Sequence, residues 1–431
     1  MKNFKNIFAI PELTRKLLFT LGVLVIYRLG AYVPAIGVNV PLLAEKMLEA
    51  SARGGLWRYL DIFSGGALFR SALFSLGIMP YITASIMMQM LSMGVPYFEQ
   101  LVKEGEYGRR IINQYTRYLT IFLSIAYSFT YALFLESSNL ALAPGWGFRL
   151  LFVLSLTTGT VFVMWLADQI SLFGIGNGSS ILIFAGIVAQ FPGHVFRTIA
   201  ALQAGMPIWH ALIILILFLF IAVCIIFVEK AERKIPIQYA RRVIGQRVYA
   251  AQSTYIPFKI NTAGVMPVIF AGAVLNLPMF ITSFLVSWTG WEIVKEFAKL
   301  IQQGAILYNI LEFLLIVFFS FVYTAVIFNP EELAENLKKS GGFVPGVRPG
   351  KRTAEFFNYI LTRIGLIGSI YLACLALAPN IMHSFIMMPF FIGGTSLLIV
   401  ISVALETSAQ IESYLLEHRY EGFLSSGRIK G

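Results

Sequence analysis

The chain has 431 residues, of which 58% are hydrophobic and only 13% are charged. Soluble domains carry about 25% charged residues, so this composition excludes an ordinary water-soluble protein and indicates a lipid bilayer as the solvent. The formal net charge of +11 is better explained by the cytoplasmic Lys and Arg residues of a membrane protein than by nucleic-acid binding.

The sequence predicts an all-α integral membrane protein with ten transmembrane helices. A helix needs about 20 mostly apolar residues to cross the hydrocarbon core, and the apolar runs lack the strict alternation of barrel strands. The predicted spans are 17–36, 72–93, 118–135, 149–167, 176–191, 211–228, 263–287, 306–328, 364–380 and 384–405. Arg28 is the deepest charge in these spans, and we interpret it as a snorkelling or helix-end cation in preference to a functional residue.

The distribution of basic residues predicts the orientation. With the N-terminus inside, most of the 33 Lys and Arg residues fall in the segments on the inner side. Positively charged residues accumulate on the cytoplasmic side of membrane proteins. Both termini are therefore predicted to be cytoplasmic.

The ten spans divide into two fives, in an N-terminal half, 1–205, and a C-terminal half, 206–431, and two phrases occur in similar form in both halves. Residues 75–86 read SLGIMPYITASI and residues 262–273 read TAGVMPVIFAGA; 178–183 read GSSILI and 394–399 read GTSLLI. The copies fall at spans 2 and 7 and at spans 5 and 10. Because each half has an odd number of spans, the halves are predicted to be inverted repeats, which place a functional passage between them near the bilayer midplane.

The matched positions at the centre of this passage are apolar, since Ile82 aligns with Ile269 and Ile183 with Ile399. Ordinary helix packing would explain such residues, but an aliphatic constriction would also exclude water and ions by dewetting. No HExxH or Ser/His/Asp pattern is present, and the two cysteines have no metal-ligand spacing. No catalytic residue, metal or cofactor is predicted.

Three connections are unusual. The cytoplasmic segments 229–262 and 329–363 are too long for simple loops and mix Arg and Lys with aromatic and β-branched residues. They are predicted to project and to dock a large partner, either RNA or an acidic protein surface. On the outer face, 61–70 is too short to span the membrane and is either a surface loop or a re-entrant segment.

Several motifs in chain order resemble the SecY family, whose members form the centre of the bacterial protein-translocation channel. These motifs are FSGGA at 63–67, LGIMPYI at 76–82, GIGNG at 174–178, RVYAAQS at 247–253, GFVPGVRPG at 342–350 and GGTSLLI at 393–399.

The resemblance implies a multi-pass protein of the cell (cytoplasmic) membrane with an hourglass-shaped pore. The pore would conduct unfolded secretory polypeptides and open sideways, between spans 2/3 and 7/8, to release membrane segments. The implied pore ring is Ile78, Ile82, Ser179, Ile183, Ile269 and Ile399. Ser179 departs from the family pattern, in which this position is commonly apolar.

The resemblance also implies a plug at about 61–73, with the residues Asp61, Phe63, Ser64, Gly65, Gly66, Leu68 and Arg70. The implied docking residues are Arg241, Arg242, Arg247 and Arg348, whereas Gln246 stands where many relatives have a basic residue. The implied partners are the SecE and SecG subunits, the SecA motor ATPase, the ribosome, signal sequences and the lipid bilayer.

Two other classes compete with a channel. An inverted-repeat secondary transporter of a small solute would share the topology, but the spans are poor in carboxylates and the basic loops are long. A membrane enzyme has no residue constellation to support it, so the chain is not predicted to be an enzyme.

Overall fold

The computed structural model describes residues 10–43, 61, 63–239, 242–244, 247–249, 253–289, 296, 305–385 and 394–427. The chain divides into two compact units. The first unit is Met1–Ala200, Asn276–Ala305 and Val403–Gly431, and the second is Ala201–Leu275 and Ile306–Ser402. Because the chain returns to the first unit after residue 275, these bounds differ from the predicted halves 1–205 and 206–431, which remain a prediction about repeats.

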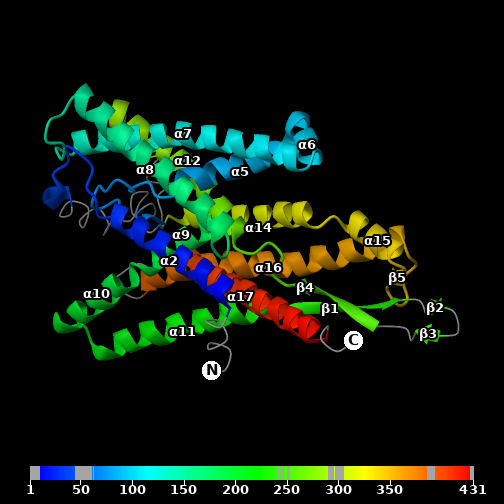
Figure 1. Cartoon of the computed structure of the whole chain (residues 1–431). Helices are drawn as coiled ribbons and strands as arrows, with labels where there is room; N and C mark the ends of the chain where they lie inside the picture. The colour runs from blue at the N-terminus through cyan, green and yellow to red at the C-terminus, as the bar shows by residue number, and fades with distance from the viewer. Residues whose placement is uncertain are drawn as a thin grey trace. The chain divides into compact units, whose positions relative to one another are not determined.

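The first unit is built from helices (Figure 1). They are α2 (Pro11–Gly30), α5 (Met79–Gly94), α6 (Pro96–Lys103), α7 (Glu106–Ser137), α8 (Trp146–Phe173) and α9 (Gly178–Val188), and α10 (Phe191–Gln203) ends across the boundary. Helix α7 packs against α5 and α8, and α8 also packs against α2 and α9. The unit therefore has its core around α8, with the segment before α5 enclosed by these helices.

The second unit contains α11 (Ile208–Lys230), α14 (Ile306–Ile327), α15 (Pro330–Lys339) and α16 (Lys351–Phe385). Helices α12 (Met266–Thr289) and α17 (Gly394–Gly427) begin in this unit and end in the first. Helix α14 packs along α16. Asn329 begins α15 as an N-cap, because its side chain accepts hydrogen bonds from the backbone of Glu331 and Glu332.

The helices agree with a multi-pass membrane protein. Among the described residues, seven helical segments are long and apolar enough to cross a bilayer: 106–137, 146–173, 178–203, 208–230, 306–339, 351–378 and 395–417. The other three predicted spans are helical in part, since α2, α5 and α12 cover 17–30, 79–93 and 266–287 of them. The predicted start of span 2 at residue 72 is wrong, because 72–78 form turns before α5. Helix α5 has only 16 residues, and α2 includes Glu12, Arg15, Lys16 and Arg28. The fold is thus consistent with ten spans, and seven of the helices described are long and apolar enough to cross a bilayer.

The boundary between the last two predicted spans is different in the structure. Span 9 was predicted to end at residue 380, but α16 continues through Pro379 to Phe385. Helix α17 begins at Gly394, and 386–393 lie outside the described residues. A proline alone therefore does not end this helix.

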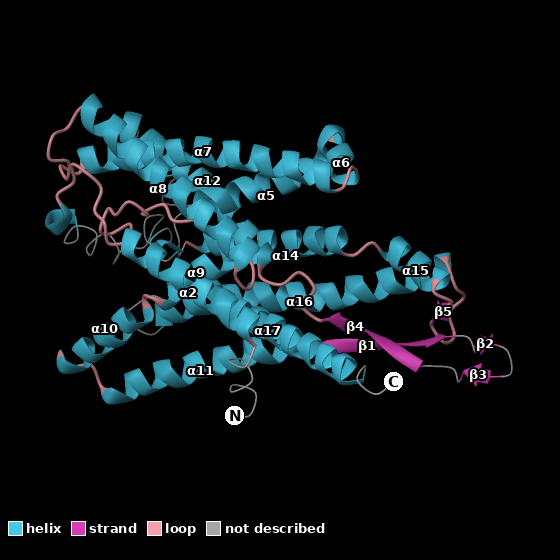
Figure 2. Cartoon of the chain, in the orientation of Figure 1, coloured by secondary structure: helices cyan, strands magenta, loops and turns pink. Residues whose placement is uncertain are grey.

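Strands occur where only loops were predicted, within 229–262 and 329–363 (Figure 2). Strand β1 (Glu232–Tyr239) pairs antiparallel with β4 (Ser253–Lys259) on one side and β5 (Gly342–Phe343) on the other. Strands β2 (Arg242–Ile244) and β3 (Arg247–Tyr249) form a second antiparallel pair. The two long connections are therefore parts of one folded element.

Candidate functional site

The two copies of the longer repeated phrase have the same local backbone. Gly77 has φ +54° and Gly264 has φ +61°, a left-handed conformation that costs an L side chain about 1–2 kcal/mol. The following helices begin at Met79 and Met266, each with proline as its second residue. Pro is favoured in the first helical turn because its missing N–H is not needed there.

The helix starts put the matched isoleucines in register. Ile82 is the fourth residue of α5, and Ile269 is the fourth residue of α12. In the second repeat, α9 begins at Gly178 and α17 begins at Gly394, so Ile183 and Ile399 are each the sixth residue of their helix. The repeats are thus equivalent in local structure as well as in sequence.

All five isoleucines of the predicted ring are buried. Ile78 and Ile82 lie one turn apart, since the Ile82 backbone N–H donates to the Ile78 carbonyl at 3.1 Å. Ile78, Ile82, Ser179 and Ile183 belong to the first unit, and Ile269 and Ile399 to the second. The structure places each residue within its own unit, and closure of a single ring remains a prediction.

Ser179 has a hydrogen-bonded role at the start of α9. Its hydroxyl donates to Asn177 Oδ1 at 2.6 Å, and its backbone N–H donates to the same oxygen at 3.1 Å. Asn177 is the N-cap of α9, and a side-chain cap of this kind stabilises a helix by about 1 kcal/mol. The polar residue in the predicted ring is therefore satisfied within its own helix turn.

The predicted plug is a buried segment rather than an exposed surface loop. Within it, Phe63, Ser64, Ala67 and Leu68 are almost fully buried, whereas Arg70 is exposed. The Arg70 guanidinium lies 4.2 Å from the centroid of the Tyr32 ring. Of the two interpretations of 61–70, the re-entrant one matches this burial.

The plug segment is closed on itself by hydrogen bonds around Asp61. The Asp61 carbonyl accepts from Ser64 Oγ at 3.1 Å and from the Gly66 N–H at 3.1 Å. Asp61 Oδ1 accepts from the Phe69 N–H at 3.2 Å. Burial raises the pKa of the Asp61 carboxyl to about 6, although Arg70 and the Phe69 N–H act in the opposite direction.

Side chains from outside the segment donate to its main-chain carbonyls. Arg28 Nη1 donates to Gly65 O at 3.2 Å, and the Tyr131 hydroxyl donates to Leu68 O at 2.9 Å. Leaving a buried carbonyl unpaired costs about 1–3 kcal/mol. The guanidinium of Arg28 is directed at the plug backbone, which favours a functional role over the snorkelling or helix-end cation preferred from the sequence.

The predicted docking loops form one subdomain in the second unit. Its apolar core joins both connections and the first turns of α16, through the buried residues Ile235, Ile237, Phe258, Ala334, Leu337, Val344, Ala354, Phe357, Ile360 and Leu361. The two connections also meet through the backbone, because Gln238 and Tyr239 of β1 pair with Phe343 and Gly342 of β5.

The predicted docking residues occupy different parts of this subdomain. Arg348 is exposed in the turn before α16, and its carbonyl accepts a hydrogen bond from Thr353 Oγ1 at 3.0 Å. Arg242 and Arg247 lie on the paired strands β2 and β3. Arg241 lies outside the described residues. The sequence analysis does not predict strands β2 and β3, and docking by these residues stays a prediction.

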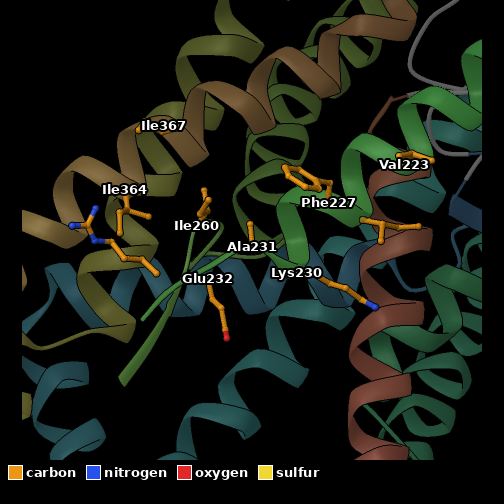
Figure 3. Close-up of a pocket in the computed structure, with 10 residues that line it drawn as sticks. Val223, Phe227, Lys230, Ala231, Glu232, Ile260, Ile364 and Ile367 are labelled. Carbon is orange, nitrogen blue, oxygen red and sulfur yellow. The ribbon is translucent and has the colours of Figure 1, made fainter. Parts of the chain in front are cut away.

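An open apolar groove of about 850 Å³ lies at the base of the subdomain (Figure 3). Its walls come from the cytoplasmic end of α11, from α16 and from the start of β1. The lining residues are Val223, Ile226, Phe227, Lys230, Ala231, Glu232, Arg233, Ile260, Ile364 and Ile367. A second groove of about 480 Å³ lies in the first unit, between α2, α9 and α17. Neither groove was predicted.

Within the part of the chain that the structure describes, no group of three His, Cys, Asp or Glu residues could hold a metal ion.

Comparisons with known proteins identify the family of this chain. The SecY family model matches residues 72–408. The protein translocase subunit SecY of Escherichia coli (strain K12) is 44% identical over 428 residues, covering 98% of this chain and 96% of that protein. The protein translocase subunit SecY of Aquifex aeolicus is 44% identical over 428 residues, covering 97% of this chain and 98% of that protein.

Solved structures share the fold. A SecY structure described for its plug domain has a TM-score of 0.67 at 18% identity, covering 93% of this chain and 92% of that chain. The Sec61 channel in a canine ribosome–channel complex has a TM-score of 0.63 at 19% identity, with the same two coverages. Through the family model and the full-length relatives, this chain belongs to the SecY family.

Proposed function

We propose that this chain is the protein-conducting subunit of a translocase in the cell membrane. It conducts unfolded secretory polypeptides across the bilayer and releases membrane segments sideways into it. The observation that carries this proposal is the 44% identity to SecY translocase subunits over nearly the whole chain. The equivalent starts of α5 and α12 and the buried segment 61–73 are the structural features that support it.

The constriction of the channel is assigned to Ile78, Ile82, Ser179, Ile183, Ile269 and Ile399. The passenger is unfolded and chemically varied, so a site with fixed polar partners would bind some residues too well and reject others. Aliphatic side chains can surround any passing residue and still exclude ions by dewetting. The register of Ile82 with Ile269 and of Ile183 with Ile399 supports this assignment.

Segment 61–73 is assigned as the plug of the closed channel, through Asp61, Phe63, Ser64, Gly65, Gly66, Leu68 and Arg70. The segment is buried and has internal hydrogen bonds, as expected of a compact plug that fills a passage. A signal sequence is an apolar helix that can bind the open channel more tightly than the closed one. Such a difference in affinity is sufficient to shift the population towards the open state.

The cytoplasmic subdomain is assigned as the docking surface for the partners that drive translocation. Arg348, Arg241, Arg242 and Arg247 provide the basic contacts for the SecA motor ATPase or for the ribosome. Two structural neighbours are described in complexes with ribosomes. SecE and SecG complete the assembly. The chain needs no catalytic activity of its own, because the motor or protein synthesis provides the energy.

Reconstitution tests the function directly. The chain, with SecE and SecG, is placed in vesicles and supplied with SecA, ATP and a precursor protein bearing a signal sequence. The expected result is ATP-dependent protection of the precursor from added protease. An absence of protection, together with uptake of a small solute on an ion gradient, would instead establish the secondary transporter.

A further inference from the structure

Within the first unit, side chains from separate elements bind the plug segment. Besides Arg28 on α2 and Tyr131 on α7, Gln190 in the turn after α9 takes part, because its Nε2 donates to the Asp61 carbonyl at 2.8 Å. Arg28 Nη1 and the Tyr131 hydroxyl donate to Gly65 O and Leu68 O at 3.2 and 2.9 Å. All of the acceptors are main-chain carbonyls of the segment.

We propose that Arg28, Tyr131 and Gln190 form a clamp that holds the plug in the closed channel, and that opening requires this clamp to release. The proposal rests on the plug assignment given above. It assigns these three residues as positioning residues, which act on the passage through the plug backbone. A hydrogen bond from a charged donor to a carbonyl is stronger than one between neutral groups, so Arg28 makes the largest contribution.

The close approach of the clamp to the backbone explains two glycines. A Cβ on Gly65, which has φ +69°, would lie 2.5 Å from Arg28 Nη1 and 2.9 Å from the Gly186 carbonyl oxygen. A Cβ on Gly186 would lie 2.9 Å from the Phe63 carbonyl oxygen. The plug and α9 can therefore touch backbone to backbone only because neither position has a side chain.

The backbone contacts differ between the two ends of the segment. At the C-terminal end, the Ala35 N–H donates to Ser71 O at 2.7 Å and the Leu73 N–H donates to Val33 O at 2.8 Å. Nearer its start, the segment is closed on itself around Asp61, and the clamp bonds connect it to the surrounding helices. For 61–70 to leave while 71–73 stay attached, the clamp bonds must break together with those from the Ser71 and Ala72 N–H groups to Leu68 O and Ala67 O, at 2.9 and 3.0 Å.

The clamp also explains why the polar side chains of Tyr131 and Arg28 lie within predicted membrane spans. Tyr131 is fully buried on α7, and Arg28 is a charge within a predicted span. These donors bind main-chain carbonyls, and the contact at Gly65 requires that this position has no side chain. The clamp therefore depends on the plug backbone and on glycine at position 65.

Thiol labelling of the plug in the assembled translocase in membrane vesicles tests the clamp. Ala67 is fully buried, so Ala67→Cys reports exposure of the plug once Cys224 and Cys374 are replaced by Ser. Tyr131→Phe and Gln190→Leu each remove a donor. Each is expected to raise the labelling rate of this cysteine about fivefold, which corresponds to about 1 kcal/mol at 1.4 kcal/mol per tenfold. Arg28→Gln is expected to raise it further.

Tyr127→Phe is the matched control. Tyr127 is a buried tyrosine on the same helix, and its hydroxyl is hydrogen-bonded to Thr83. This variant loses a buried hydroxyl but is expected to leave the labelling rate unchanged. Equal labelling in Tyr127→Phe and Tyr131→Phe would show a general loosening of α7 and would overturn the clamp. Arg28→Lys retains the charge without the planar donor pair and tests the geometry if Arg28→Gln does not assemble.

A second measurement separates the clamp from the plug assignment. Ion leak through the idle channel is measured for the clamp variants and for a chain lacking 61–70. If the deletion leaves the leak unchanged, the plug assignment is wrong. If the deletion raises the leak, but Tyr131→Phe and Gln190→Leu change neither leak nor labelling, the clamp is wrong and the plug assignment stands.

Discussion

Gly77 and Gly264 have the same left-handed backbone conformation, with φ +54° and +61°, two residues before helices that both begin with Met-Pro. The two repeats therefore match in backbone conformation at this position as well as in sequence. Gly77 precedes Ile82 by the same number of residues as Gly264 precedes Ile269. The two glycines therefore place the two isoleucines at the same position in their helices.

Replacing these glycines by alanine is expected to destabilise the chain. A Cβ at Gly264 would meet no atom within 4 Å, so the cost of Gly264→Ala is that of the backbone conformation, about 1–2 kcal/mol. Gly77→Ala is expected to cost a similar amount. The thermal unfolding temperature of the purified complex measures the loss. Gly22→Ala in α2, which also meets no atom within 4 Å and lies in a helix, is expected to be neutral or stabilising. A Gly22→Ala loss as large as that of Gly264→Ala would contradict the explanation.

Polar substitution of the matched isoleucines is expected to weaken the seal. The double variant Ile82→Asn, Ile269→Asn introduces amides that hold water in the constriction, so ion leak rises and precursors with defective signal sequences are admitted. The measurements are vesicle conductance and translocation of such a precursor. Ile82→Leu, Ile269→Leu keeps the volume and apolar character and serves as the control. An unchanged leak and unchanged stringency in the Asn variant would remove these two residues from the ring.

Charge reversal at Arg348 is expected to disrupt docking of the motor. Arg348→Glu replaces an exposed cation with an anion, which would oppose an acidic partner surface. The translocation-stimulated ATPase rate of SecA is expected to fall, and to fall most steeply at low salt. Lys338→Glu makes the same charge change at another exposed position of the subdomain and should have a smaller effect. Equal rates for Arg348→Glu and the unaltered chain would exclude Arg348 from docking.

The plug is expected to seat more firmly in acid. Burial raises the pKa of the seated Asp61 from 3.8 to about 6, so the seated state takes up a proton more readily than the released one. Seating is therefore strengthened as the pH on the outer face falls through about 6, and this contribution is lost above it. Arg70 and Arg197 lie near enough to oppose the shift without cancelling it.

The leak of the idle channel, measured between about pH 5 and pH 8 on the outer face, reports this titration. The leak is expected to decrease in acid. Asp61→Asn retains the acceptor for the Phe69 N–H and removes the charge, so it should abolish the pH dependence and keep the leak low at neutral pH. A pH dependence that survives in Asp61→Asn would assign it to another group.

The sequence was sufficient for features that repeat or that depend on local composition. The Gly-x-Met-Pro phrases predicted matched helix starts, and both helices do begin at that methionine. The apolar runs predicted a multi-pass helical protein. The predicted helix ends were less accurate. Helix α16 continues through Pro379, where the usual effect of proline on a helix predicts a break.

Features that depend on distant partners were missed. Residues 232–239 have alternating burial, with Ile235 and Ile237 inside, and this period of two could have indicated a strand. Its pairing with Gly342 and Phe343, however, comes from the other long connection and leaves no local signal. The hydrogen-bond acceptor of Arg28 was missed for a similar reason. It is the main-chain carbonyl of Gly65, and because every residue has such a carbonyl, the sequence does not mark it.

Photo-crosslinking to a stalled passenger tests the central claim most directly. A precursor with a folded C-terminal domain is arrested in the assembled translocase, with a photoreactive side chain at position 82 in one sample and at position 269 in another. If α5 and α12 line one passage, both positions will crosslink to the arrested chain, and an exposed position on α11 such as Phe220 will not. Arrest of the precursor without a crosslink from position 82 or position 269 would contradict the account.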